Sequence, residues 1–279
     1  MPTDASLRAL REASPRNQPG FNGSIERYDA LRTQITATPV PYPRRLPRPR
    51  RASANSLNLV SLQSPPPVVR HLRADERGLR TATGAKFVAV ARDRQLVIRT
   101  LARNAKEAAA VAKLAPGERD DVDLRRDLDR LSAASPPQVG GVRVGTAQHA
   151  GRILSFYREA QRRFGIRWEL LAAINFVESD FGRARTTARA DAQGPMQFEP
   201  ATWRAYGMGG DVYNEHDAVL AAANLLAANG GRTNELAALG HYNLSPLYWD
   251  AVLHLAHRIA TVPAAFREYY AWKLYLRKS

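Results

Sequence analysis

Residues 168–181, WELLAAINFVESDF, form the stretch that decides the fold of this chain. Its long apolar run predicts a buried helix, and Gly182 is expected to end that helix. Leu171, Ile174 and Glu178 follow the i, i+3, i+7 spacing that places side chains on one helical face. We therefore expect Glu178 to be half removed from water near the C-terminal end of a core helix.

The placement of Glu178 suggests a chemical role. Burial disfavours the charged form of a carboxyl group, and a general acid that works near neutral pH has to hold its proton. The plainer interpretation is a glutamate at a helix end whose carboxylate reaches solvent, as most glutamates do. Motifs downstream of Gly182 favour the chemical role.

Composition excludes several kinds of site. The 279 residues are 44% apolar, enough for a core, and contain no cysteine, so disulfides and thiolate metal sites are excluded. The six histidines are scattered without an HExxH spacing, and we expect neither a metal nor a cofactor. No run reaches the roughly 18 consecutive apolar residues of a membrane span. The N-terminus lacks the apolar segment typical of a signal peptide.

Most of the net charge of +15 lies in the N-terminal half. Residues 1–150 contain 26 Lys and Arg against 14 Asp and Glu. Proline and arginine dominate residues 1–70, which we predict to be a disordered segment. Such a segment most simply keeps a chain soluble, and attraction to a polyanion is the alternative. Because aromatic residues are not interleaved with the basic ones, we expect no nucleic-acid partner.

Helical periodicity divides the rest of the chain into three parts. In residues 71–140, apolar residues recur at helical spacing over 86–115 and 121–133, which predicts an accessory pair of helices. Residues 141–262 contain six or seven short helical patterns and no βαβ alternation, which predicts a mainly α or α+β domain. Residues 263–279 form an aromatic C-terminal tail.

Three short motifs lie in the predicted domain. They are Glu178-Ser179-x-Phe181-Gly182, Gly194-Pro195-Met196-Gln197-Phe198-x-Pro200-x-Thr202-Trp203, and His241-Tyr242-Asn243. Each alone is weak, because Gln197 is most simply a solvated loop residue, Tyr242 a core residue and Asn243 a turn residue. In this order and at these separations, they resemble the lytic transglycosylases of the soluble lytic transglycosylase and goose-type lysozyme group. The flanking segments resemble actinobacterial members.

The resemblance covers about residues 147–259 and implies a lysozyme-like fold acting on peptidoglycan outside the cytoplasmic membrane. It makes Glu178 the catalytic acid/base, with Ser179 supporting its loop or contacting substrate. It also places substrate-binding roles on Met196, Gln197 and Phe198, which line the sugar cleft, and on Tyr242 and Asn243, which face the carboxylate. Two positions depart from the family: His241 replaces a small residue, and residues 187–191 replace a Ser-Ala-Gly run.

The implied mechanism needs a single acid. Glu178 protonates the glycosidic oxygen of the MurNAc–GlcNAc bond, and the sugar's N-acetyl group stabilises the cationic centre. Glu178 then accepts the C6 hydroxyl proton of muramic acid, which closes a 1,6-anhydro ring without water. We expect the enzyme to be a monomer whose partner is the peptidoglycan glycan strand.

Two alternatives remain open. A lysozyme-type hydrolase needs a second carboxylate, and the candidates are Asp180, Asp191, Asp211 and Asp217. Asp211 is more simply a turn residue, and Asp217 the N-cap of a helix over residues 218–228. A non-catalytic glycan-binding module would keep the cleft without turnover.

Overall fold

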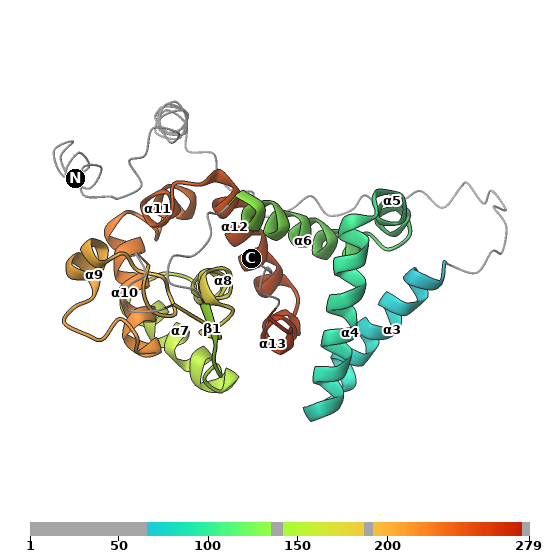
Figure 1. Ribbon diagram of the computed structural model, residues 1–279, viewed down its shortest axis with the longest axis horizontal. Helices are drawn as coiled ribbons and strands as arrows, with labels where there is room; N and C mark the ends of the chain where they lie inside the picture. The colour runs from blue at the N-terminus through green and yellow to red at the C-terminus, as the bar shows by residue number, and fades with distance from the viewer. Residues whose placement is uncertain (1–65, 135–141, 187–191, 275–279) are drawn as a thin grey trace. The chain divides into compact units, whose positions relative to one another are not determined.

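The computed structural model describes residues 66–134, 142–186 and 192–274. These residues are mainly helical, as predicted, with one antiparallel sheet of two strands, β1 (Val142–Val144) and β2 (Ala184–Thr186) (Figure 1). The helices in the described ranges are α3 (Pro67–Thr81), α4 (Gly84–Arg103), α5 (Ala105–Leu114), α6 (Pro116–Ala134), α7 (Ala150–Phe164), α8 (Trp168–Ser179), α9 (Pro200–Tyr206), α10 (Glu215–Ala228), α11 (Glu235–Tyr242), α12 (Pro246–Thr261) and α13 (Ala265–Ala271). None of them combines the length and hydrophobicity of a bilayer-spanning segment.

The predicted core helix is α8. Residues 170–174 are all fully buried, because α7, α10 and α12 pack around the helix (Figure 1). A helix that is apolar on every side is stable only in such a position. The stretch that decides the fold therefore lies at the centre of the core.

The aromatic residues beyond Pro263 belong to the same core. The helix α13 contributes Phe266 and Tyr269, both buried, to the cover of the C-terminal end of α8. The ring of Phe266 meets that of Phe181 edge to face at 5.7 Å, and the ring of Tyr269 lies 6.0 Å from that of Phe176. In its described part, the predicted tail is thus a packed helix.

The accessory region begins earlier and has more helices than the sequence predicts. The helix α3 starts at Pro67, inside the segment predicted to be disordered, whereas residues 1–65 lie outside the described ranges. The stretch predicted as one helix over 86–115 is divided into α4 and α5 at Asn104. The Asn104 side chain caps α5 by accepting from the Glu107 N–H at 3.2 Å. An asparagine competes with the helix for these bonds, which makes it a strong cap.

A buried ion network joins the accessory helices to α12 and α13. Arg94 of α4 donates to Glu268 at 3.0 Å and to Asp121 at 2.5 Å, and also to Glu118. Arg258 of α12 donates twice to Asp121, at 2.9 and 2.8 Å. All five side chains are buried. Buried charges are tolerated only when they are paired in this way.

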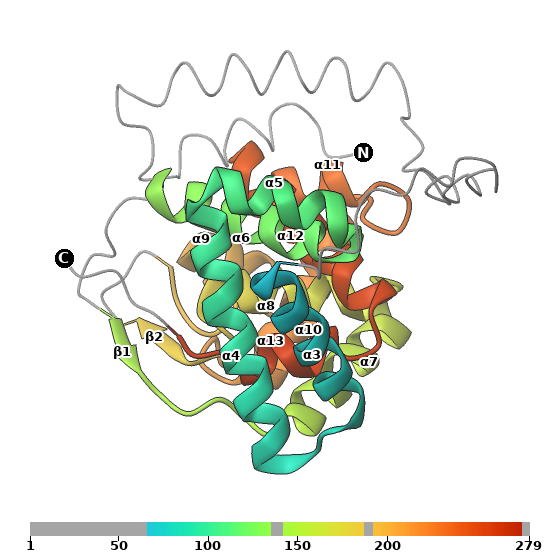
Figure 2. The same ribbon diagram turned by 90° about the vertical axis from the view of Figure 1, so that its right-hand side faces the viewer.

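The helices from α3 onward therefore belong to one packed body, and Pro67–Ser279 form one compact unit. Figure 2 shows α3, α4 and α6 in front of α8 and α12. The predicted boundary near residue 140 lies outside the described ranges, so the division into 71–140 and 141–262 stays a prediction.

Candidate active site

Glu178 lies half-buried in the last turn of α8, just before a tight left-handed turn. Asp180, Phe181 and Gly182 have φ values of 51°, 59° and 78°. The prediction that Gly182 ends the helix was wrong, because α8 already ends at Ser179 and Asp180 takes the left-handed cap position. Aspartate tolerates this conformation, whereas phenylalanine rarely adopts it. Complete burial of the Phe181 ring offsets that strain.

Ser179 and Asn175 fasten the end of α8 to the second motif. The Ser179 hydroxyl donates to the carbonyl oxygen of Pro195 at 2.6 Å and accepts from the Gly182 N–H at 2.8 Å. The Asn175 amide donates to the same Pro195 oxygen at 2.9 Å. Both side chains are 1% exposed, so these bonds are made away from water and fix the two motifs against each other.

The second motif closes into a tight loop. Gln193 and Phe198 form an isolated antiparallel bridge, with N–H to oxygen distances of 2.9 and 2.8 Å. Gly194 has a φ of 71°, and a Cβ atom there would lie 1.8 Å from the carbonyl oxygen of Val212. Only glycine fits such a position. The Gln197 amide donates to the Gly194 carbonyl at 2.7 Å, which holds the loop closed from within.

The third motif reaches the same loop from α11. The Tyr242 hydroxyl donates to the Met196 carbonyl at 2.6 Å, and the Tyr242 ring stacks on Tyr248 with the centroids 6.2 Å apart and the planes 9° apart. Burial first, and the charge of Glu178 second, raise the pKa of both tyrosines well above the ordinary value. The three motifs therefore converge around Glu178.

Tyr248, in the first turn of α12, is a site residue that the sequence interpretation missed. Its buried hydroxyl has no hydrogen-bond partner of ordinary geometry among the described residues, yet it lies close enough to Glu178 for the carboxylate to raise its pKa. The only signal in the sequence is a tyrosine six positions after Tyr242 in an otherwise apolar helical face.

Residues 155–249 match the family model described as the transglycosylase SLT domain. The match runs from α7 into α12 and includes all three motifs. Residues 155–249 form an SLT domain. Comparisons with curated proteins and with solved structures gave no match. The SLT domain implies lytic transglycosylase activity on peptidoglycan, outside the cytoplasmic membrane.

Several residues expected to bind substrate lie inside the SLT domain. Met196 and Phe198 are 0% and 3% exposed, and the Phe198 ring packs edge to face on Trp203 at 5.3 Å. Gln197 and Asn243 are half-buried. The Asn243 side chain accepts from the Ser245 N–H at 2.9 Å, which shapes the entry into α12. The geometry thus gives these side chains support roles, and their contact with substrate stays a prediction.

The aspartates considered as second carboxylates of the SLT domain have other partners. Asp180 is buried, and burial raises its pKa to about 6, against the opposing charge of Arg183 at 3.5 Å. Asp211 accepts from the Tyr213 N–H at 2.9 Å, as expected of a turn residue. Asp191 lies outside the described residues.

The predicted role of Asp217 was wrong. The helix α10 begins at Glu215, and its N-cap is Asn214, whose side chain accepts from the His216 N–H at 2.9 Å. Asp217 lies within the first turn, and its carboxylate accepts from the Asp211 N–H at 3.0 Å. Asparagine three positions earlier caps the helix equally well, which the sequence pattern did not distinguish.

Glu215 is a half-buried carboxylate near the first motif that the sequence interpretation missed. Burial raises its pKa to about 7, against the opposing charges of Arg185 and Arg152. A Cβ atom added to Gly182 would lie only 2.3 Å from the Oε1 atom of Glu215. The carboxylate therefore packs directly on the backbone of the first motif. In the sequence it looks like an ordinary acidic residue at a helix start.

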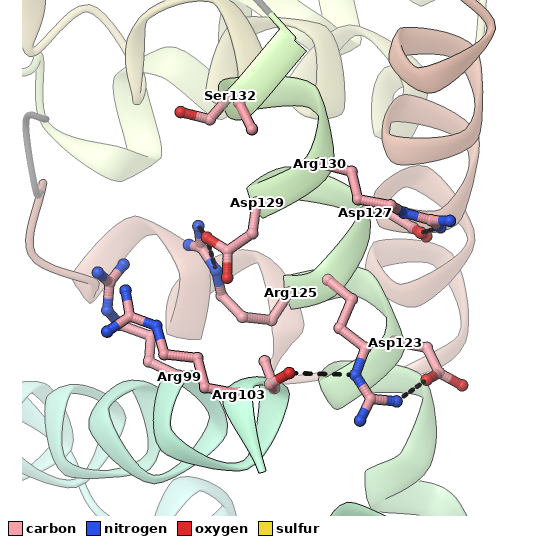
Figure 3. Close-up of a pocket in the computed structure, with 11 residues that line it drawn as sticks. Arg99, Arg103, Asp123, Arg125, Asp127, Asp129, Arg130 and Ser132 are labelled. Atoms are coloured by element: carbon pink, nitrogen blue, oxygen red, sulfur yellow. Dashed lines mark hydrogen bonds and ion pairs between the residues drawn. The ribbon is translucent and has the colours of Figure 1, made fainter. Parts of the chain in front are cut away.

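A pocket of about 860 Å³ lies between α4 and α6, outside the SLT domain. Figure 3 shows Arg125 turned toward Asp129 and Arg130 toward Asp127, and Arg126 pairs with Asp123 at 3.2 Å. None of the residues that line the pocket belongs to a motif. Its charges are largely matched within α6, so we do not assign it to the sugar substrate.

Proposed function

We propose that the SLT domain cleaves the β-1,4 bond between MurNAc and GlcNAc and releases 1,6-anhydro-MurNAc products, with Glu178 as the single acid/base. The observation that supports this assignment is the convergence of the three motifs at the end of α8. Burial, and after it the charge of Glu178, raises the pKa of Tyr242 from the third motif and of Tyr248 at the start of α12. Its half-buried position suits a group that has to give and take a proton.

In the proposed reaction, the Glu178 carboxyl group donates its proton to the glycosidic oxygen as the bond between this oxygen and C1 of MurNAc breaks. The N-acetyl oxygen of this MurNAc stabilises the positive charge at C1. The Glu178 carboxylate then takes the proton of the C6 hydroxyl as its oxygen bonds to C1. Glu178 ends the cycle protonated, no water is consumed, and the 1,6-anhydro ring is closed.

The neighbouring side chains suit this cycle. Tyr242 and Tyr248 have raised pKa values, so they stay neutral phenols throughout the working pH range. Ser179, Met196 and Phe198 would position the loop, and the amides of Gln197 and Asn243 would meet the N-acetyl or peptide groups of the glycan. The partner is a peptidoglycan strand, with no nucleic acid and no cofactor, and the chain would act as a monomer in the cell wall or periplasm.

The surroundings of the aspartates favour a transglycosylase over a lysozyme-type hydrolase. A hydrolase base has to face a water molecule across the sugar from the acid. Asp180 is held by Arg183, and Asp211 and Asp217 hold a turn together. These three carboxylates already have structural tasks, which supports a mechanism that uses the substrate's own hydroxyl group.

The test is Glu178→Gln, assayed on purified peptidoglycan sacculi with mass spectrometry of the released fragments. Loss of a general acid/base costs about 10²–10⁴ in rate, and we expect the helical circular dichroism to be unchanged. Glu169→Gln is the matched control, because Glu169 lies in the first turn of the same helix and is also half-buried.

Undiminished turnover by Glu178→Gln rejects the assignment. Products one water heavier than the anhydro form identify a hydrolase instead. Binding to sacculi by the unmodified chain, with no fragments released after long incubation, identifies a glycan-binding module.

A further inference from the structure

Three metal-ligating side chains converge on the accessory hairpin of α3 and α4. His71 and Asp75 lie one turn apart on α3, and Asp93 lies on α4. The Nε2 atom of His71 is 2.6 Å from Asp93 Oδ2 and 3.5 Å from Asp75 Oδ2. One ligand atom from each residue lies within 4.8 Å of the other two. Both carboxylates therefore face the same nitrogen of one imidazole ring.

A proton on this nitrogen cannot serve both carboxylates. A single N–H points at one acceptor, and the shorter contact gives it to Asp93. Asp75 is only 7% exposed, and its Oδ2 atom has no hydrogen-bond partner among the described residues. A buried carboxylate oxygen without a partner is costly.

Other histidines in the described ranges show the difference. His216 also has two carboxylates nearby, but Glu159 lies 3.0 Å from Nε2 and Asp217 lies 3.4 Å from Nδ1. Each ring nitrogen there serves its own partner, so a protonated imidazole satisfies both. His254 pairs with Asp127 through Nδ1 at 3.0 Å. Of these three histidines, His71 is the one at which a second carboxylate approaches a ring nitrogen that already has a partner.

We infer that His71, Asp75 and Asp93 bind a divalent transition-metal ion of the Zn²⁺ class, which ties α3 to α4. One imidazole and two carboxylates are ligands that Zn²⁺ accepts, at about 2.0–2.2 Å. Tetrahedral ligands at that distance are roughly 3.3 Å apart, and the two observed separations from Nε2 lie on either side of this value. Small side-chain movements would bring the three atoms onto one ion.

The ion would replace the imidazole proton and satisfy the buried Asp75 oxygen at the same time. The His71 and Asp93 side chains are 47% and 51% exposed, so water can reach the remaining coordination position. Asp93 is also next to Arg94, which anchors α4 in the buried ion network. The proposed ion would therefore reinforce the attachment of α3 to the body of the protein, apart from the reaction at Glu178.

The test uses the full chain, freed of metal by dialysis against a chelator and titrated with ZnCl₂ by calorimetry. Co²⁺ serves as a spectroscopic probe, because its visible absorption reports tetrahedral coordination. We expect one ion per chain, a tetrahedral Co²⁺ spectrum and a raised melting temperature, and no competition from Mg²⁺. Loss of one ligand in Asp93→Asn or His71→Gln should weaken binding at least roughly 100-fold.

The control is His216→Gln, which removes a histidine that also has two carboxylates nearby, and it should bind as the unmodified chain does. Wild-type affinity in both Asp93→Asn and His71→Gln overturns the site. Absence of any Zn²⁺ or Co²⁺ binding at millimolar metal overturns it as well. If His71→Gln does not fold, Asp93→Asn alone tests the site, because the Asp93 side chain is half-exposed and its substitution should not disturb the fold. These outcomes are independent of turnover, so they separate this inference from the assignment of Glu178.

Discussion

Buried polar groups are satisfied in two different ways in two regions of the described chain. In the network around Arg94 and Asp121, the buried groups are ionisable, and two arginines bridge the carboxyl groups across four helices. At the junction of the three motifs, the side chains that join the motifs to one another are neutral. Hydroxyl and amide groups there bond to backbone carbonyls of the loop over residues 194–198.

The difference shows which region fastens the fold and which one prepares chemistry. Paired charges hold helices firmly, but their strength depends on every partner being present. Neutral donors fix the backbone without setting the protonation state of the nearby acid through a counter-charge. Two phenols with raised pKa values beside Glu178 are consistent with a carboxyl group that has to change its charge during turnover.

Removal of Arg94 should have the largest effect on stability. Arg94→Met would leave three buried carboxylates, those of Glu118, Asp121 and Glu268, with Arg258 as the remaining cation of the network. Breaking a buried pair costs about 3–5 kcal/mol. Urea unfolding of the full chain, followed by circular dichroism, measures the loss.

The control for Arg94 is Arg80→Met, which breaks an exposed i, i+4 pair with Glu76. Exposed pairs contribute about 0.3–0.5 kcal/mol, so the unfolding midpoint should hardly move. Equal midpoints for the two variants would show that the network does not fasten the accessory helices.

A methyl group at Gly194 should distort the loop over residues 194–198, where the three motifs meet. Gly194→Ala combines a left-handed backbone, which costs about 1–2 kcal/mol, with a Cβ 1.8 Å from the Val212 carbonyl. Gly209→Ala has the same kind of strain, at φ 79°, with no atom within 4 Å of the Cβ. We expect both variants to lose stability, and only Gly194→Ala to lose activity on sacculi as well. Equal activity would mean that the loop does not position Glu178.

The two stacked tyrosines should separate stability from activity. Tyr242→Phe leaves the Met196 carbonyl without its donor, so we expect a loss of about 1–3 kcal/mol in the free energy of unfolding. Tyr248→Phe removes a buried hydroxyl that has no ordinary hydrogen-bond partner among the described residues, so stability should not fall. Because that hydroxyl lies within reach of the Glu178 carboxylate and can donate a hydrogen bond to it during turnover, turnover should fall roughly two- to tenfold, the contribution of one such bond. Unchanged turnover would exclude Tyr248 from the site.

Much of this site could be predicted from the sequence, because its parts are local. The apolar run over residues 168–176 predicts the core helix, and the order of the three motifs predicts that they meet. Gly194 is recognisable in the sequence as part of a motif. The contact that requires glycine there is with the carbonyl oxygen of Val212, eighteen residues later in the chain. Proximity of this kind depends on packing, which periodicity does not report.

The site residues that were not predicted from the sequence also meet only through packing. Tyr248 and Glu215 look like ordinary residues near helix starts, and only the folded chain brings them beside Glu178 and Gly182. His71 and Asp75 have a spacing that suits a ligand pair, but Asp93 joins them only through the packing of α3 on α4. Asn214 was missed as a cap because several polar residues near that helix start satisfy the same local rule, and Asn104 was missed because the helical periodicity continues across it.

The smallest predicted effect is a pH dependence of stability that comes from the charged network. Two arginines and three carboxylates leave one excess negative charge, and burial raises the pKa of Glu268 to about 8, against the opposing charge of Arg94. Its ordinary value is 4.5. Between these values the folded chain holds a proton that the unfolded chain releases. Stability should therefore fall as the pH rises through this interval.

Glu268→Gln tests the contribution directly, because a glutamine oxygen can still accept from Arg94 while carrying no titratable proton. Burial also raises the pKa of Glu215 and Asp180, so the unmodified chain keeps part of its slope from those groups. The informative quantity is the difference in melting temperature between variant and unmodified chain, followed from about pH 5 to pH 8. That difference should move in favour of the variant as the pH rises. Glu107→Gln, at an exposed glutamate, should give a constant difference. If the difference in melting temperature for Glu268→Gln is also independent of pH, Glu268 holds no extra proton in the folded chain. The network around Arg94 would then keep the same charge throughout this pH range.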